Sequence, residues 1–449
     1  MMLGNLFTTS HHKTFDKGIH TADHKSETNN KKIQQFPFAP LMIIPLNQHI
    51  GKPAIPIVQI DQEVERGEVI AKADGWVSSP IHSPASGKIK KIDLVPHISG
   101  NLVNGIYIQT FPASTQESLE TKGFRPDDSA EKLLQAIQSA GIVGLGGAAF
   151  PTHCKLKTPP DIKVNTLLIN GAECEPYLTT DHRVMLEQTN DIFMGIRYLQ
   201  KITSAKNIVI GIEDNKKDAA EKLLDSKPDD LAIKVELVAV KYPQGAEKIL
   251  IKALLKRDIP ANKHSSDFGI VGVNVATTAE IGRLLPIGRG IQERVITIAG
   301  PGIINKGNYR IPIGTPLDFI LESVGVSENM NQLFFGGPMM GQAAPNLQVP
   351  VMKGTSGIIA FTENNKSSLK SKPLPCIHCG ACVQHCPMFL NPSTLGLLSQ
   401  NQEYQTMLEK YHLKDCFECG VCSYVCPSHI PLVQYFRTAK TLAKKLSKT

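Results

Sequence analysis

The chain has 449 residues, of which 41% are hydrophobic and 20% are charged, and its formal net charge at pH 7 is +7. This composition is ordinary for a soluble globular protein, and the length exceeds one ordinary core, so about three or four domains are expected. Aromatic residues make up only 6% and basic residues gather in the C-terminal tail, which leaves nucleic-acid binding unsupported.

Neither a membrane span nor a secretory signal is predicted. The uncharged stretch 329–352 is broken by glycines, prolines and amides, and the stretch 133–151 contains glutamines and a run of glycines. The N-terminus lacks the apolar core and cleavage site of a secretory signal. Residues 1–35 are polar and are predicted to form a disordered leader. A metal-binding tract is the alternative, because the leader contains His11, His12, His20 and His24.

Residues 36–112 are predicted to form a barrel-sandwich module of short strands. The segment 67–71, followed by a Ser-Pro-x-x-Gly-x-Ile hairpin at 83–89, is similar to the flattened barrel of lipoyl- and biotinyl-carrier domains. Those carriers attach their cofactor to a lysine at a hairpin tip, but the corresponding tip at Ser83–Ser86 has no lysine. We therefore expect a docking or structural module.

A glycine-rich loop follows an amphipathic helix that is predicted at 127–140. Within it lie Gly141, Gly144, Gly146 and Gly147. Glycines allow backbone N–H groups to approach an anion such as a phosphate, and Lys155 is near enough in sequence to neutralise the charge. No predicted strand runs directly into the loop, so it is not a Rossmann fingerprint, and a plain turn is the alternative.

Residues 125–290 are predicted to form a central α/β domain. Strands are expected at 165–170, 208–212, 235–240 and 269–275, with helices at 218–224 and 246–255. This alternation is typical of a parallel sheet with crossover helices. The polar segment from Asn170 to Pro176 follows the first strand, at the end of the sheet where ligands bind in such folds.

Three further segments can be assigned a structure from their sequence patterns. Residues 291–362 are predicted to form a small β-grasp-like α+β module, and residues 363–373 are predicted to form a polar linker. Residues 431–449 are predicted to form a basic amphipathic helix whose apolar stripe packs on the preceding domain. Contact with an acidic partner or an anionic membrane surface is the alternative for this helix.

The segment 374–430 contains the motif C-x2-C-x2-C-x3-C-P twice. This spacing holds [4Fe–4S] cubes, and the fourth cysteine of such a motif ligates the other cluster in two-cluster ferredoxins. The segment is therefore predicted to be an enlarged ferredoxin domain with helices between its motifs. One cube is assigned to Cys376, Cys379, Cys382 and Cys426, and the other to Cys416, Cys419, Cys422 and Cys386.

Two structural zinc sites are the alternative for these cysteines, since four-cysteine tetrahedra also use C-x2-C pairs. Zinc does not explain the third and fourth cysteine of each motif or the proline after each. Eight of the ten cysteines lie in the motifs, which indicates a reducing, cytoplasm-like compartment. The chain is therefore predicted to transfer single electrons.

Taken together, these segments resemble a known family, the C subunit of the Rnf (Rsx) electron transport complex of bacteria. Residues 141–152, 165–183, 241–249 and the doubled cysteine motif carry the resemblance, which extends from about residue 36 to residue 430. The middle domain is also similar, more distantly, to the flavin subunit of respiratory complex I. The resemblance implies FMN held non-covalently, with NADH stacked on it.

The resemblance also implies roles for single residues. Gly144 and Gly146, with Gly147 beside them, would approach the FMN phosphate and ribityl chain, and Phe150 would stack on the NADH adenine. Further residues that match cofactor contacts are Lys155, Asn170, Gly245, Glu247, Asn274 and Thr277. Glu173 and Glu175 match the paired acids near the flavin and nicotinamide. Three positions depart from the complex I pattern, with Leu145 for arginine, Ala172 for aspartate and Ala246 for glutamate.

The function implied by the resemblance is that of an oxidoreductase subunit that passes electrons between NADH, FMN and the two cubes, in either direction. It would be peripheral on the cytoplasmic face of the bacterial inner membrane, held by other subunits of the complex, especially the iron–sulfur subunit. A flavin-free electron-wiring or scaffold subunit is an alternative that the three departures favour. A soluble ferredoxin-linked NADH dehydrogenase is another.

Overall fold

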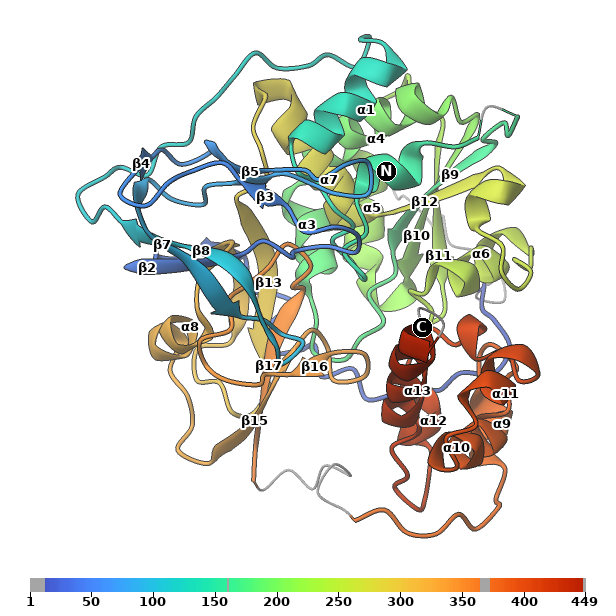
Figure 1. Cartoon of the computed structure of the whole chain (residues 1–449). Helices are drawn as coiled ribbons and strands as arrows, with labels where there is room; N and C mark the ends of the chain where they lie inside the picture. Colours follow the sequence, from blue (N-terminus) through green and yellow to red (C-terminus); the bar gives the residue numbers. More distant parts are fainter. Residues whose placement is uncertain (1–12, 160, 364–371, 447–449) are drawn as a thin grey trace.

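Four folded parts make up residues 13–159, 161–363 and 372–446, which this computed structural model describes. Figure 1 shows the N-terminal barrel beside a central α/β domain, a mixed sheet near the barrel, and a helical C-terminal domain below the α/β domain. Residues 1–12, with His11 and His12, and most of the predicted linker lie outside the described residues.

The barrel consists of two small antiparallel sheets that share one core. The first has the order β2 (Leu41–Pro45), β8 (Leu102–Thr110), β7 (Gly87–Pro96) and β4 (Glu63–Val64), and the second β3 (Ile55–Pro56), β5 (Val69–Lys72) and β6 (Ile81–His82). Met42, Ile70 and Ile106 are fully buried between them. The turn Ser83–Ser86 is part of this core, since Ser83 and Ala85 are 0% exposed. A turn buried in this way supports a structural role.

The central domain contains the expected parallel sheet with crossover helices, which is confirmed. Its strands lie in the order β11 (Ile233–Val238), β10 (Asn207–Glu213), β9 (Thr166–Gly171) and β12 (Ile270–Asn274), all parallel. Its helices are α1 (Ala130–Ser139), α2 (Thr152–Leu156), α3 (Thr180–Glu187), α4 (Thr189–Thr203), α5 (Lys217–Asp225), α6 (Glu247–Leu255) and α7 (Val275–Leu284). Polar loops at the C-terminal ends of β9 and β12 therefore lie side by side.

Sequence reasoning did not predict helices α3, α4 and α7. Two glycines inside these helices, Gly195 in α4 and Gly282 in α7, lower the helix propensity that a sequence pattern reports. In the structure these glycines allow the two helices to pack closely. A Cβ on Gly195 would overlap the backbone of Thr278 in α7, and a Cβ on Gly282 would overlap the backbone of Asp191 in α4. Close packing of α4 against α7 offsets the weak propensity.

The third part is a mixed six-stranded sheet with one helix. Its order is β1 (Ile33–Gln35), β14 (Gly307–Pro312), β13 (Glu293–Ala299), β17 (Gly357–Thr362), β15 (Met330–Phe335) and β16 (Gln342–Ala343), and its helix is α8 (Leu317–Val324). The predicted strands and helix of this segment are present, and β13 pairs antiparallel with β14 but parallel with β17. Edge strand β1 comes from the N-terminal segment.

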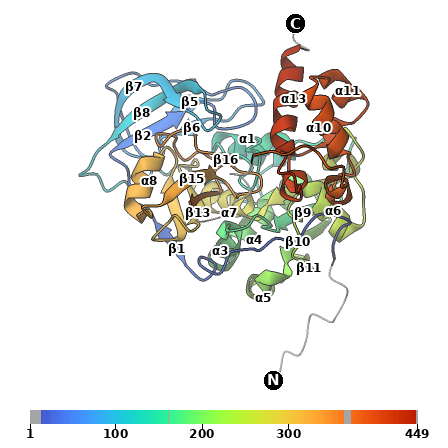
Figure 2. The same cartoon turned by 90° about the horizontal axis from the view of Figure 1, so that it is seen from below.

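The C-terminal domain is a group of short helices, as predicted. They are α9 (Ala381–His385), α10 (Pro392–Gln400), α11 (Tyr404–Glu409), α12 (Val421–Tyr424) and α13 (Leu432–Leu446), and Figure 2 shows α13 beside α10 and α11. Leu432, Phe436 and Ala439 of α13 are buried in this domain. The prediction that the terminal helix packs on the preceding domain is confirmed. No helix of the described residues has both the length and the apolar character needed to span a bilayer.

The prediction of a disordered leader is wrong for residues 13–35. This N-terminal segment runs across the molecule, and its strand β1 adds to the mixed sheet. Lys25 is buried and its ammonium donates to the carbonyls of Glu173 and Glu175 at 2.9 Å. The segment is held by backbone hydrogen bonds, by this ammonium and by the buried side chains of Phe15 and Ile19, and these contacts are mostly with distant parts of the chain. Its polar composition therefore did not reveal that it is ordered. Of the histidines in this segment, His20 has its Nδ1 3.0 Å from the Val240 carbonyl oxygen and His24 stacks on Tyr177.

The N-terminal segment also joins the helical C-terminal domain to the α/β domain. Gly18 N–H donates to the carbonyl of His385 at 3.1 Å, and Ile19 exchanges two backbone hydrogen bonds with Tyr242, at 2.8 and 2.9 Å. A side chain at Gly18 would lie 2.6 Å from the Tyr242 carbonyl oxygen. The segment therefore touches both domains at one point.

Replacing Gly18 with alanine is expected to release this segment. Gly18 has φ +73°, so alanine is strained there, and it also meets the Tyr242 carbonyl. Gly100→Ala is the matched control, because Gly100 has φ +81° with nothing within 4 Å of an added Cβ. Hydrogen exchange of residues 13–24 should become faster in Gly18→Ala and stay unchanged in Gly100→Ala. Equal exchange in both variants would contradict the assigned contact.

Candidate functional site

The glycine-rich loop lies over the C-terminal edge of the parallel sheet. The Thr277 hydroxyl accepts a hydrogen bond from Leu145 N–H at 2.9 Å, and the buried Arg294 guanidinium donates to the Leu145 carbonyl at 2.9 Å. A Cβ on Gly146 would overlap the Asn274 side chain, whereas a Cβ on Gly147 would meet nothing within 4 Å. The loop is therefore held firmly from below, at Leu145 and Gly146, and is open at Gly147.

Two asparagines at the ends of neighbouring strands support the loop. Asn274 ends β12 and caps helix α7, where its Oδ1 accepts from Ala276 and Thr277 N–H. Its Nδ2 donates to Asp181 Oδ2 at 2.7 Å. Asn170 is the penultimate residue of β9, and its Nδ2 donates to the Gly245 carbonyl at 2.8 Å. The structure thus brings both predicted asparagines, Gly245 and Thr277 together with the glycine loop.

Lys155 is ion-paired with Glu247, and both side chains are about one-third exposed, at 36% and 32%. Glu247 also accepts a hydrogen bond from Ser265. The lysine lies on α2, directly after the loop, and Phe150 at the loop's end is 37% exposed. These three predicted residues remain accessible from solvent on the side of the glycine loop.

The two predicted acids, Glu173 and Glu175, point in different directions. Glu173 is buried, and its Oε1 accepts from Asp181 N–H at 2.9 Å while its Oε2 has no hydrogen-bond partner. Glu175 accepts from Met339 and Met340 N–H at 3.1 and 2.8 Å. Burial raises the pKa of Glu175 to about 7, although these backbone donors oppose the rise. The Glu175 carboxylate therefore contacts backbone N–H groups of the loop between strands β15 and β16. Its proposed place near a nicotinamide stays a prediction.

The half-buried Asp181 and the buried Glu173 form an acid pair next to Asn274. Burial, together with the neighbouring Glu173 carboxylate, raises the pKa of Asp181 from 3.8 to about 7, although the Asn274 amide that donates to it opposes the rise. Asp181 is therefore partly protonated near neutral pH.

Asp181→Asn is expected to make the stability of the protein less dependent on pH. Between about pH 4 and about pH 7 the folded protein keeps a proton on Asp181 that the unfolded chain has released, so this group destabilises the fold as pH rises. Each unit of pKa difference corresponds to ~1.4 kcal/mol of unfolding free energy. Denaturant unfolding at about pH 5 and about pH 8 measures the change. An equally steep decline in the variant would contradict the raised pKa.

The residues present fit a flavin phosphate at the loop. The loop leaves open space above Gly147, its backbone is braced by Thr277 and Arg294, and Lys155 supplies a positive charge that Glu247 now neutralises. The amides of Asn170 and Asn274 already have partners within the protein, so they shape the site from below. The open glycine backbone is thus the part best suited to an anionic ligand.

The eight motif cysteines line two cavities in the C-terminal domain. One cavity, of about 430 Å³, is lined by Cys376, Cys379, Cys382 and Cys426. A second, smaller cavity is lined by Cys386, Cys416, Cys419 and Cys422. Each cavity thus receives three cysteines from one motif and the fourth from the other, which is the donor set of a [4Fe–4S] cube.

The cysteines are not arranged for single metal ions. Within the described part of the chain, no three His, Cys, Asp or Glu side chains converge closely enough to hold one ion. A tetrahedral zinc site needs such convergence, whereas a cube takes one thiolate at each of four separate irons. The residues therefore fit two cubes better than two zinc ions.

Tyr242 connects the α/β domain to the second cavity. Its hydroxyl donates to the carbonyl of Cys419 at 2.7 Å and lies 3.4 Å from Glu175 Oε1. Its ring is buried in a cluster with Ile19 and Val421. Both cavities are lined only by residues of the C-terminal segment, but the contact with Tyr242 of the α/β domain is made at Cys419, which lines the second cavity.

Sequence reasoning missed three residues that organise these sites. Arg294 braces the glycine loop, Lys25 holds the loop of Glu173 and Glu175, and Tyr242 reaches Cys419. Lys25 lies in a polar segment that gave no sign of burial, and Arg294 is a charged residue at the start of an apolar strand. Tyr242 lies within the matched segment 241–249, but its partner is 177 residues away in the sequence.

Three family matches cover most of the chain. Residues 13–111 match the RnfC barrel sandwich hybrid domain, residues 137–283 the Nuo51 FMN-binding domain, and residues 375–430 the 4Fe-4S dicluster domain. The predicted barrel-sandwich module, FMN-binding domain and two-cluster domain are thereby confirmed.

Curated relatives are similar over nearly the whole length. The C subunit of the proton-translocating ferredoxin:NAD(+) oxidoreductase complex of Clostridium ljungdahlii is 42% identical over 96% of this chain and 94% of the relative. The C subunit of the Na(+)-translocating ferredoxin:NAD(+) oxidoreductase complex of Acetobacterium woodii is 39% identical over 87% of this chain and 88% of the relative. The C subunit of the ion-translocating oxidoreductase complex of Rhodobacter capsulatus is 39% identical over 94% of this chain and 82% of the relative.

Among solved structures, a crystal structure of an NAD+-reducing [NiFe]-hydrogenase in the H2-reduced state has a TM-score of 0.50 and 17% identity. The match covers 71% of this chain and 61% of that chain. At this level of identity the likeness concerns the fold alone.

Proposed function

Because this chain belongs to the family of C subunits of ion-translocating ferredoxin:NAD(+) oxidoreductase complexes, we propose that it is the subunit in which electrons pass between NAD(H), FMN and two [4Fe–4S] clusters. One observation carries this proposal above the others. A single chain holds the open glycine loop and both four-cysteine cavities, and Tyr242 joins the domain of the loop to one of the cavities.

The chemistry requires both kinds of cofactor. NADH gives up two electrons together, a cube accepts one, and FMN exchanges electrons in either number. The chain's own residues hold and shield these groups: the loop from Gly144 to Gly147 would bind the flavin phosphate, Lys155 would neutralise it, and Phe150 would stack against the adenine of NADH. Asn170, Glu173, Gly245, Glu247, Asn274 and Thr277 would shape the remaining walls.

We assign the cubes by the same cross-ligation that the motif spacing predicts, with Cys426 completing one and Cys386 completing the other. The cube of Cys386, Cys416, Cys419 and Cys422 would be the nearer to the flavin, since Tyr242 reaches the carbonyl of Cys419. The other cube would then exchange electrons with a partner, because its cavity opens among the exposed side chains Leu374 and Ile377.

The protein would act as a peripheral subunit on the cytoplasmic face of the bacterial inner membrane, held by the other subunits of its complex and above all by an iron–sulfur subunit. The absence of a spanning helix from the described residues is compatible with this placement. Residues 291–362 would form a β-grasp-like α+β module, as the order of strands β13 and β14, helix α8 and strands β15 and β17 suggests.

The test is an absorbance spectrum of the anaerobically purified protein, with iron and flavin measured, before and after NADH is added. We expect about eight irons and about one FMN per chain, with bleaching by NADH. The same iron without flavin would instead support the electron-wiring subunit, which is favoured by the apolar residues Leu145, Ala172 and Ala246. Recovery of the activity in a membrane-free fraction of the cell, without the complex, would support the soluble dehydrogenase.

A further inference from the structure

A polar cavity of about 300 Å³ lies where the barrel meets the α/β domain. We call it the arginine cavity and define it by Arg66, Gln116, Arg283, Arg289, Gln292 and Glu293. Helix α7 begins at Val275, beside Asn274 of the glycine-loop region, and ends at Leu284, which lines this cavity. A helix of this length spans about 15 Å. The arginine cavity is therefore separate from the proposed flavin site, at the opposite end of the same helix.

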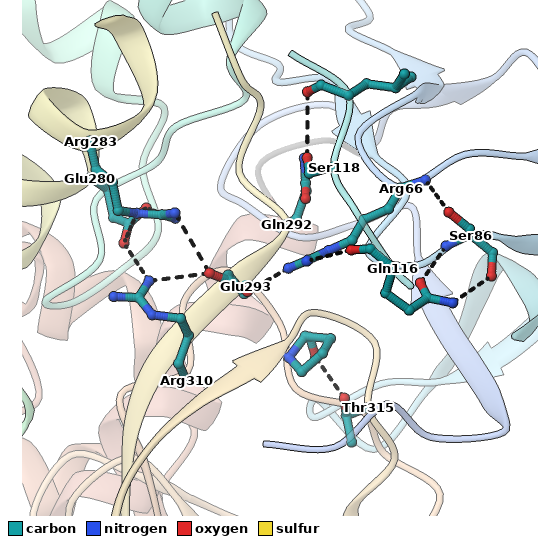
Figure 3. Close-up of polar contacts among 12 residues, drawn as sticks. Arg66, Ser86, Gln116, Ser118, Glu280, Arg283, Gln292, Glu293, Arg310 and Thr315 are labelled. Atoms are coloured by element: carbon teal, nitrogen blue, oxygen red, sulfur yellow. Dashed lines mark hydrogen bonds and ion pairs between the residues drawn. The ribbon is translucent and has the colours of Figure 1, made fainter. Parts of the chain in front are cut away.

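Positive charge predominates in the lining, which contains three guanidinium groups and one carboxylate. Arg66 comes from the barrel and donates to Glu293 of β13 at 2.6 Å (Figure 3). Arg283 pairs with Glu280, at 2.6 Å, and Arg310 lies behind them, 3.3 Å from Glu293. Burial lowers the pKa of Arg66, and the nearby charges of Arg283 and Arg289 lower it further, against the effect of Glu293. The guanidinium groups are thus close enough to repel one another.

Two donors of this lining have no acceptor. The Nε atoms of Arg66 and of Arg289 are both buried and have no hydrogen-bond partner. Among the described residues, the Arg289 side chain pairs with Glu120 at 2.6 Å, and the Glu120 side chain is 56% exposed. An exposed pair of this kind is weak, and buried charged donors are normally satisfied. Two of the arginines that line the cavity therefore carry a buried donor that no protein acceptor satisfies.

We propose that the arginine cavity binds a small multivalent oxyanion, bearing phosphate or carboxylate groups, between the barrel and the α/β domain. The planar forks of arginine match both kinds of group in a bidentate manner. The volume lies at the lower end of small-molecule pockets, of about 300 to 1,000 Å³, which excludes a dinucleotide. A ligand held by Arg66 on one side and by Arg283 and Arg289 on the other would tie the barrel to the α/β domain.

The experiment uses the whole protein loaded with FMN and clusters, so that the proposed flavin site is filled. Calorimetric titration with inorganic phosphate and, separately, with tricarballylate distinguishes the two kinds of group, at an ionic strength held constant with sodium chloride. We expect Arg289→Gln to weaken binding by about tenfold or more, since a charge-assisted hydrogen bond is lost. Glu120→Gln should strengthen binding several-fold, because the carboxylate no longer competes for Arg289.

Arg197→Gln is the matched control, since Arg197 forms an ion pair with the exposed Asp230 and lines no part of the cavity. It should bind the anion as the unaltered protein does. Flavin bleaching by NADH should be unchanged in Arg289→Gln, which separates this inference from the proposed function. Failure of both anions to bind, or equal binding to Arg289→Gln and the unaltered protein, would overturn the proposal.

Discussion

Cys386→Ser is expected to remove one cube and leave the other, so that about half of about eight irons remain in the purified protein. Cys386 directly follows helix α9 of the first motif, but it lines the cavity of Cys416, Cys419 and Cys422. Loss of one thiolate leaves three ligands for four irons. Flavin should still be bleached by NADH, while electron transfer to an external iron–sulfur acceptor should fall by at least about tenfold, since a cube on the path is missing.

Double variants distinguish cross-ligation from ligation within one motif. If Cys386 and Cys416 hold the same cube, the variant lacking both should contain as much iron as either single variant. The variant lacking both Cys376 and Cys386 should then lose nearly all its iron, because these cysteines line different cavities. The opposite pattern would refute cross-ligation. Cys154→Ser is the control, since Cys154 lies beside Trp76 of the barrel and lines neither cavity.

Gly147→Val is expected to abolish flavin binding without unfolding the protein. A Cβ on Gly147 meets no protein atom within 4 Å, so the fold should tolerate valine there. The same space is where we place the flavin phosphate and ribityl chain, and a branched side chain would fill it. Flavin content after purification should fall from about one per chain to nearly none, and reduction by NADH should be lost with it.

Iron content is the internal control for Gly147→Val, since the cysteine cavities are in a separate domain and should stay loaded. Gly146→Val makes a useful contrast, because a Cβ there would overlap Asn274 and so disturb the loop itself. It should therefore lower both flavin content and thermal stability. Full flavin content in Gly147→Val would show that the cofactor does not approach the loop at this point.

Lys155→Ala is expected to have a smaller effect on flavin binding at the same site than Gly147→Val. The lysine is paired with Glu247 and partly exposed, so its removal should weaken flavin retention without disturbing the core. If flavin content after dialysis matched that of the unaltered protein, Lys155 would not contribute to phosphate binding.

Patterns of local spacing allowed much of the fold and the sites to be predicted. The cysteine motifs, the glycine loop and the strand ends at Asn170 and Asn274 are local features, and their chemistry depends on residues close together in the sequence. The four parallel strands were predictable because continuous apolar runs flanked by helical patterns have few other solutions. Helices α4 and α7 were not predicted, because each contains a glycine that lowers its apparent helix propensity. The order of residues 13–35 was not predicted either, because this polar segment is held by backbone hydrogen bonds to distant residues.

The sequence by itself determined the two clusters, because the identity and spacing of the cysteines in each motif specify a [4Fe–4S] cube. The glycine loop alone indicated at most an anion site, and FMN followed from the resemblance to a known family. Only the tertiary structure decided how these parts are joined. The contacts of Tyr242 with Cys419, of Lys25 with Glu173, and of Arg66 with Glu293 each connect residues more than 140 positions apart. Such contacts arise from the packing of whole domains, and no local pattern of the chain records them.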